Sequence, residues 1–156
     1  MGEDMARGII IFGSAGSGKT TFGKKIYRLM TDISKESYFV MAGSMDSFNE
    51  PFVPLFNFAV HITASVETRI ACIYKREYEI FGERIVKDGD LYEAHCHFLD
   101  IAARYDLDGS PCMKTHGQWA NSLHCKVLRL SGDEDLNKNS DIIVQEYLSK
   151  SIQKES

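Results

Sequence analysis

Eight consecutive residues near the start of the chain match G-x-x-x-x-G-K-[ST], a pattern in which backbone N–H groups surround the phosphates of a nucleotide. Lys19 is expected to bridge the outer phosphates, and the Thr20 hydroxyl is expected to be a ligand of the accompanying Mg²⁺. Thr21 either adds a hydroxyl to the inner phosphates or caps the following helix. This glycine-rich loop, residues 13–20, consists of Gly13, Ser14, Ala15, Gly16, Ser17, Gly18, Lys19 and Thr20. The pattern predicts a bound nucleoside triphosphate.

The residues on either side of the glycine-rich loop are of the types that such a loop requires. The apolar run 9–12 predicts a buried strand. Residues 20–29 predict a helix, because Phe22, Ile26 and Leu29 fall on one face. A strand that enters the loop and a helix that leaves it direct backbone N–H groups and the helix N-terminus at one phosphate.

Predicted strands and helices alternate along the rest of the chain. Further strands are expected at residues 38–42, 58–62 and 127–130, and further helices at 66–81, 91–104, 110–123 and 142–152. The apolar stripes expected to be buried are Val66, Ile70, Ile73 and Tyr74 in one helix, and Leu91, Phe98, Ile101 and Ala102 in another. This alternation predicts an α/β fold of three layers, in which a small parallel sheet of about four strands is flanked by helices.

Length and composition are those of an ordinary globular domain. The 156 residues, 44% of them apolar, are enough for a substantial core, and residues 1–156 are expected to form a single domain. The net charge of -4 argues against a large nucleic-acid-binding surface, which is usually basic. Neither a membrane-spanning run nor a signal peptide is found in the sequence, so we expect a cytoplasmic location with reduced cysteines. The oligomeric state stays open.

A second segment of the sequence is similar to a known family. The strand at 58–62, the following residues 64–69 (ASVETR) and the triplet Lys75-Arg76-Glu77 resemble the segment that leads into the lid of nucleoside-monophosphate-type P-loop kinases, such as adenylate kinase and shikimate kinase. This resemblance implies a P-loop NTPase fold with ATP and Mg²⁺ as cofactors. It also implies transfer of the γ-phosphate to a small-molecule acceptor, either a nucleotide or a hydroxyl metabolite. Residues 81–106 also look like small kinase-like ATPases of bacteria.

The resemblance assigns roles to individual residues. Arg76 matches the second of two arginines, four residues apart, of which the second contacts the transferring phosphates, and the first falls at Cys72. Arg84 lies in the lid-like segment, residues 76–90, where lid arginines are found. Gly132 lies in a turn that resembles the one beside the adenine. The resemblance therefore implies Lys19, Arg76 and Arg84 as the catalytic cations and leaves the base-stacking arginine missing.

Arg76 also has an ordinary structural interpretation. A cation on a helix surface can pair with Glu79 or Glu83, which lie three and seven residues further on. Arg69 is a weaker functional candidate on the same helix.

Two other features depart from the family. Six residues, 32–37, stand where complete kinases have a further strand and an acceptor-binding segment, so this segment is expected to be missing around 31–37. The family's Asp before a glycine is replaced by Ala42. Asp46 is the nearest carboxylate, and it either binds Mg²⁺ through water or is a solvated loop residue. These departures leave open an alternative function, a nucleotide-binding sensor or partner module without kinase turnover.

Two rival classes have weaker support. The residues that could form a zinc site on paper are His95, Cys96, His97, Cys112, His116, His124 and Cys125. They lack C-x-x-C or H-x₃-H spacing, and His95 and His97 fall on different faces of one helix, so we expect partly buried, uncoordinated side chains. The N-K-x-D sequence that recognises guanine does not occur, so a GTP-dependent switch is not favoured.

Overall fold

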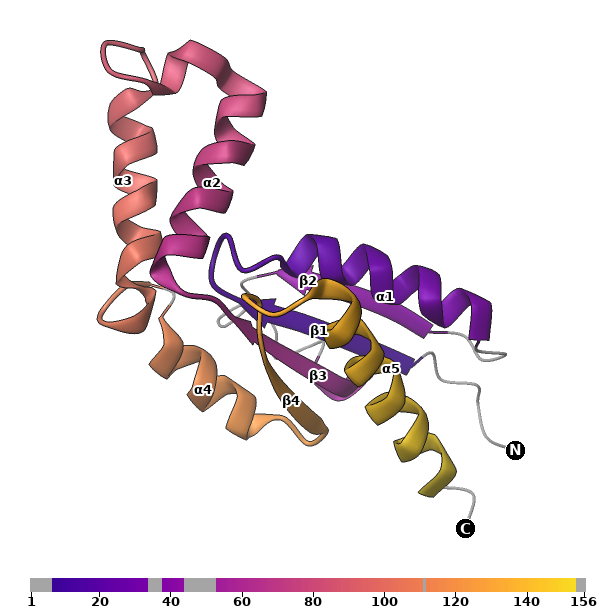
Figure 1. Ribbon diagram of the computed structural model, residues 1–156. Helices are drawn as coiled ribbons and strands as arrows, with labels where there is room; N and C mark the ends of the chain where they lie inside the picture. The colour runs from indigo at the N-terminus through magenta and orange to yellow at the C-terminus, as the bar shows by residue number, and fades with distance from the viewer. Residues whose placement is uncertain (1–6, 34–37, 44–52, 111, 154–156) are drawn as a thin grey trace.

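The computed structural model of the chain describes residues 7–33, 38–43, 53–110 and 112–153. Four strands form one sheet: β1 (Arg7–Gly13), β2 (Tyr38–Gly43), β3 (Phe56–Thr63) and β4 (Lys126–Ser131). Their order is β2-β1-β3-β4, and every pair is parallel. The prediction of a small parallel sheet of about four strands is therefore confirmed for the described residues (Figure 1).

Helices connect the strands and lie on both faces of the sheet. They are α1 (Lys19–Ile33), α2 (Val66–Phe81), α3 (Tyr92–Ala103), α4 (Met113–Ser122) and α5 (Leu136–Gln153). Short 3-10 turns are η1 (Val53–Leu55), η2 (Gly82–Ile85) and η3 (Arg104–Asp106). No helix in the described part of the chain has both the length and the apolar character for crossing a membrane.

The central strand β1 is buried on both faces, which explains its unbroken apolar sequence. Ile9 and Ile11 point into one core, where α1 and α5 cover the sheet through Phe22 and Ile143. On the opposite face a second core forms around Phe12, with Ala120 and Leu123 at the end of α4. Helices therefore cover both faces, and the three-layer prediction is confirmed in this coarse form (Figure 1).

Helix α2 spans the predicted residues, but it lies differently from the expectation. Together with α3 it forms the α2–α3 hairpin (residues 66–103), which extends away from the sheet (Figure 1). Ile73 is buried as predicted, whereas Tyr74 is 45% exposed, so its predicted burial was wrong. Arg69, like Ile73, is buried with no exposed surface. Periodicity identified the helix, but its packing partner is α3 rather than the sheet.

Helix α5 begins six residues before its predicted start at residue 142. Asp135 caps the new start, because its carboxylate accepts a hydrogen bond from the backbone N–H of Lys138 at 3.0 Å. The side chain of Asn139 donates to the Ser131 carbonyl at 2.7 Å, which ties the first turn to the end of β4. The polar first turn of α5 therefore belongs to the helix, although it carries no apolar stripe.

Candidate functional site

The glycine-rich loop lies at the carboxyl end of β1 and touches two other elements. A Cβ on Gly13 would lie 2.0 Å from the Ile62 carbonyl oxygen, near the end of β3. At Gly16 it would lie 2.5 Å from the Arg69 carbonyl oxygen in α2. Both glycines also have positive φ angles, 152° and 75°. A side chain at either position would separate the loop from its neighbours, so glycine is required at both.

Inside the loop, polar groups converge on one backbone carbonyl. The Ser17 hydroxyl donates to the Ser14 carbonyl at 2.8 Å, and the Lys19 ammonium donates to the same oxygen. The Ser14 hydroxyl itself is buried without a hydrogen-bond partner among the described residues. The Lys19 ammonium and the backbone N–H groups of the loop are donors of the kind from which phosphate oxygens accept hydrogen bonds.

The surroundings of Lys19 disfavour its protonated form. Burial, and after it the positive charge of Arg76, lower the pKa of Lys19 from 10.5 to about 8. The effect of Arg76 shows that this exposed side chain lies close enough to act on the loop. Neither Glu79 nor Glu83 pairs with Arg76 in the described structure; Glu83 instead accepts from the Tyr78 hydroxyl at 2.7 Å. Neither Lys19 nor Arg76 has a carboxylate partner among the described residues, and a bound anion would stabilise the charge of both.

Arg84 does not lie at the glycine-rich loop. It belongs to η2, at the far end of the α2–α3 hairpin from the sheet (Figure 1). Its guanidinium donates to both carboxylate oxygens of Asp90, from Nε at 2.9 Å and from Nη2 at 2.7 Å. This bidentate pair raises the pKa of Arg84 and lowers that of Asp90. Arg76 is therefore close enough to lower the pKa of Lys19, whereas Arg84 lies at the hairpin tip.

Arg69, a weaker functional candidate in the sequence, makes structural contacts in the fold. Its side chain is completely buried, and Nη2 donates to Asp106 at 2.8 Å. The same guanidinium donates to the carbonyls of Ala102 and Ala64, and it lies over the Tyr105 ring, 5.5 Å from the centroid. Arg69 thus joins α2 to the end of α3 and to η3 beside the loop. The sequence carried no signal for this, because Asp106 lies 37 residues away.

The turn after β4 completes the surroundings of the loop. A Cβ on Gly132 would lie 2.6 Å from the Ser17 carbonyl oxygen, so this turn also touches the loop. Asp133 accepts hydrogen bonds from the backbone N–H and the hydroxyl of Ser65, at 2.8 and 3.2 Å. Hydrogen bonds from Thr68 and Ser65 lower the pKa of Asp133. The structure therefore places Gly132 beside the predicted site and fixes the start of α2 there.

The predicted Mg²⁺ ligands are Thr20 and Asp46. Thr20 lies in the first turn of α1 with its side chain exposed beside the loop, and Thr21 follows it on the same turn. Asp46 lies outside the described residues. Within them, no group of three His, Cys, Asp or Glu side chains is arranged for a metal ion. Of the two predicted Mg²⁺ ligands, Thr20 and Asp46, only Thr20 lies within the described residues.

Two of the histidines considered for zinc, His95 and His116, have other partners. The Tyr105 hydroxyl lies 2.9 Å from His61 Nε2 and 2.7 Å from His116 Nδ1, so it can donate to one ring and accept from the other. His95 is buried and paired with Glu77, whereas His97 is exposed on the other side of α3. These contacts fasten helices to one another and to the sheet.

Comparison with known proteins identifies a similar protein whose activity is not described. No family model matches the chain. The chain is similar to YqaC of Bacillus subtilis (strain 168), which is described as an uncharacterized protein. The two are 24% identical over 123 residues, which cover 78% of this chain and 68% of the Bacillus protein.

Proposed function

We propose that this protein is a P-loop kinase, which binds ATP and Mg²⁺ at the glycine-rich loop and transfers the γ-phosphate to a small-molecule acceptor. One observation carries the proposal. Burial and the charge of Arg76 lower the pKa of Lys19 in the loop. An anion bound beside Lys19 would stabilise its protonated form and oppose both effects. The motif match and the resemblance to nucleoside-monophosphate-type kinases point to the same ligand.

The proposed roles follow from the positions of the side chains. Lys19 and the backbone N–H groups of the loop hold the β- and γ-phosphates at the N-terminus of α1. Arg76, in the second half of α2, stabilises negative charge on the transferred group. Mg²⁺, bound with the triphosphate, would neutralise further charge on the phosphate oxygens, and the Thr20 hydroxyl would be one of its ligands. The turn at Gly132 is placed to border the nucleoside.

A second candidate is a nucleotide-binding sensor without turnover. The observation that favours it is the position of Arg84, which is paired with Asp90 at the hairpin tip and does not reach the loop. Ala42, which stands in place of the family's carboxylate, also favours a sensor without turnover. Binding of ATP is common to both candidates, so only turnover separates them.

An acceptor screen distinguishes the two candidates. Nucleoside monophosphates, nucleosides and hydroxy acids are each incubated with ATP and Mg²⁺, and ADP is measured. A kinase gives ADP production that depends on the acceptor and is lost in the Lys19→Ala variant. If ATP binds but no acceptor increases ADP production above the basal rate, the kinase proposal is rejected in favour of the sensor.

A further inference from the structure

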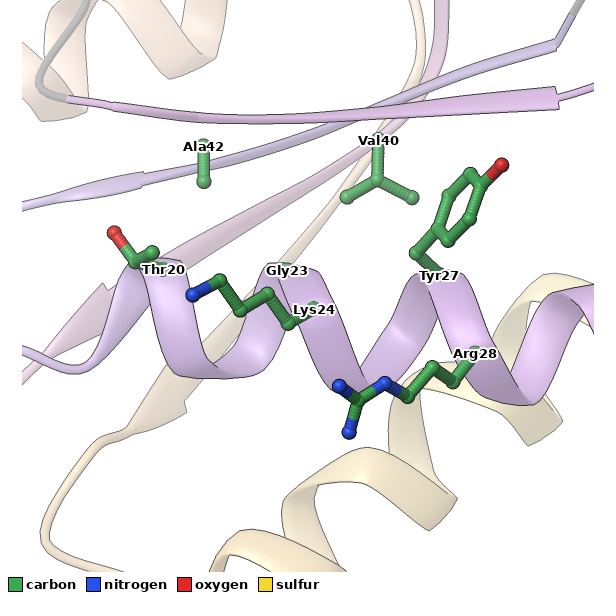
Figure 2. Close-up of a pocket in the computed structure, with 7 residues that line it drawn as sticks. All are labelled: Thr20, Gly23, Lys24, Tyr27, Arg28, Val40 and Ala42. Atoms are coloured by element: carbon green, nitrogen blue, oxygen red, sulfur yellow. The ribbon is translucent and has the colours of Figure 1, made fainter.

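The glycine-rich loop is open on the side that faces β2. A groove of about 480 Å³ lies between α1 and this edge strand, and it begins at Thr20, the residue next to Lys19. Figure 2 shows the side chains of Thr20 and Ala42 directed toward each other across the groove. In the described part of the chain, the closest approaches of the loop are instead to β3, to the turn after β4 and to α2.

The contact between the loop and α2 is made by the main chain of Arg69. A Cβ on Gly16 would lie 2.5 Å from the Arg69 carbonyl oxygen, 3.0 Å from its Cα and 3.1 Å from its carbonyl carbon. The three nearest atoms all belong to this residue, so the loop packs directly against the helix at position 69. Because close-packed groups transmit displacement, a shift of the helix at Arg69 would move the loop or break this contact.

The side chain of Arg69 fastens this point of α2 to the rest of the fold. Its Nε donates to the Ala102 carbonyl at 3.2 Å, and its Nη1 donates to the Ala64 carbonyl. Its Nη2 pairs with Asp106 at 2.8 Å, and its Cζ lies 5.5 Å from the centroid of the Tyr105 ring. The side chain has no exposed surface, so these contacts hold the first turn of α2 to the end of α3 and to η3.

The same helix carries Arg76. This residue lies seven positions after Arg69, which is two turns further along on the same side of α2. The helix extends away from the sheet (Figure 1), so its direction depends on how its first turn and its contacts with α3 are held. A tilt at Arg69 would displace Arg76, which lies about 10 Å further along the helix axis. The position of Arg76 relative to Lys19 therefore depends on the contacts of Arg69.

We propose, on the basis of the proposed function, that Arg69 is a positioning residue of the nucleotide site. Its pair with Asp106 and its bonds to two carbonyls fix the first turn of α2 against the glycine-rich loop, and the helix held in this direction keeps Arg76 toward Lys19. The guanidinium of Arg69 is used within the fold, so it acts through Arg76 and not on a ligand. Such support matters, because a displacement of about 1 Å at a catalytic group can lower a rate about a hundredfold.

A double-mutant cycle on the pKa of Lys19 tests this inference in the free protein. The Lys19 amine is titrated by NMR in the parent, in Arg69→Lys, in Arg76→Ala and in the double variant. Arg69→Lys keeps the charge, but one ammonium group cannot replace the planar fork that reaches Asp106 and two carbonyls. Arg76→Ala should raise the pKa of Lys19, because the charge of Arg76 lowers it. Arg69→Lys should raise it at least half as far, and this effect should be lost in the Arg76→Ala background.

Two further variants accompany the cycle. Arg104→Lys is the matched control, because Arg104 also lies in η3 but pairs with Asp108 at the surface, and it should leave the pKa of Lys19 unchanged. Where circular dichroism shows that Arg69→Lys does not fold, Asp106→Asn takes its place, since it removes the same ion pair from its less buried side. Asp106→Asn should raise the pKa of Lys19 more, or lower it less, in the parent than in the Arg76→Ala background.

Failure of this inference and failure of the proposed function give different results. If Arg69→Lys leaves the pKa of Lys19 at the parent value, or shifts it equally with and without Arg76, Arg69 does not act through Arg76 and the inference is overturned. An unchanged pKa of Lys19 in Arg76→Ala overturns it as well. Neither result affects the nucleotide site, which is tested by titrating ATP into the parent alongside the cycle. If ATP does not bind, the proposed function fails, and the role of Arg69 in a nucleotide site fails with it.

Discussion

Lys19 combines a position inside the glycine-rich loop with a lowered pKa. Its ammonium contacts the Ser14 carbonyl, and the only effects that act on its pKa favour loss of the proton. A bound triphosphate would act in the opposite direction, because negative charge stabilises the protonated amine. A lysine whose pKa is lowered in the free protein, and would be raised again by an anionic ligand, is typical of a binding residue.

The pH dependence of ATP binding follows from this pKa. Below pH 8 the Lys19 amine of the free protein is protonated, so affinity should vary little. Above pH 8 a proton must be taken up on binding, and affinity should fall by about tenfold per pH unit. Dissociation constants measured from pH 7 to pH 9.5 check this. Constant affinity up to pH 9.5 would contradict a pKa near 8 for Lys19 in the free protein.

At the scale of elements, the α2–α3 hairpin depends on one buried arginine. Replacing Arg69 by Met should lower the free energy of unfolding by about 3 kcal/mol, because Asp106 and two backbone carbonyls lose a donor. Arg84→Met is the matched control, since its pair with Asp90 is exposed to solvent, and it should leave stability unchanged within error. Urea denaturation of the two variants checks the contrast, and equal losses would contradict it.

Contact between the turn at Gly132 and the glycine-rich loop gives a second test. Gly132→Ala places a methyl group 2.6 Å from the Ser17 carbonyl oxygen, so the turn must move and ATP affinity should fall about tenfold. Gly117→Ala is the control: it lies inside α4 with no atom within 4 Å of the added Cβ, and it should stabilise the fold by about 0.5–1 kcal/mol. Titrations with ATP and thermal unfolding measure both. An unchanged ATP affinity in Gly132→Ala would show that this turn does not contribute to ATP binding.

The elements differ in how much of them could be predicted from sequence. Strand β1, the glycine-rich loop and α1 were predictable because adjacent residues determine them: an apolar run, then a glycine pattern, then a helical stripe. The direction of α2 was not, since periodicity identifies an apolar side without identifying what covers it. Tyr74 is exposed for this reason, and Arg69 is buried by partners that lie 33 and 37 residues further along the chain.

At the scale of the whole molecule, a buried polar network joins the sheet to the helices. His61 of β3 stacks on Phe12 at 4.7 Å between centroids and shares the Tyr105 hydroxyl with His116 of α4. Burial first, then the charges of His116 and Arg129, lower the pKa of His61 from 6.5 to about 4. The network is therefore built for a neutral His61.

This network predicts loss of stability in acid. The folded pKa of His61 lies below its unfolded value, so its contribution is complete above pH 6.5 and is lost as the pH falls toward 4. The free energy of unfolding should fall by about 2 kcal/mol between pH 7 and pH 5 from this group. His61→Gln should remove that part of the pH dependence, whereas His97→Gln, at an exposed position, should keep it. Urea denaturation at both pH values measures the difference, and identical pH dependence in the two variants would contradict the assignment.

At the scale of the whole molecule, two cations act at the loop that follows β1, although the protein has a net charge of -4. Lys19 lies in the glycine-rich loop and Arg76 lowers its pKa, and neither has a carboxylate partner among the described residues. In open parallel sheets ligands bind at the carboxyl ends of the strands, where this loop lies.

The most direct test of the central claim is a calorimetric titration of ATP, with and without Mg²⁺, into the parent protein and two variants. We predict saturable binding of one ATP to the parent, at least a hundredfold loss of affinity in Lys19→Ala, and no loss in Lys25→Ala, which removes a neighbouring cation outside the loop. Absence of saturable binding to the parent, or equal affinity of Lys19→Ala and the parent, would contradict a nucleotide site at the glycine-rich loop.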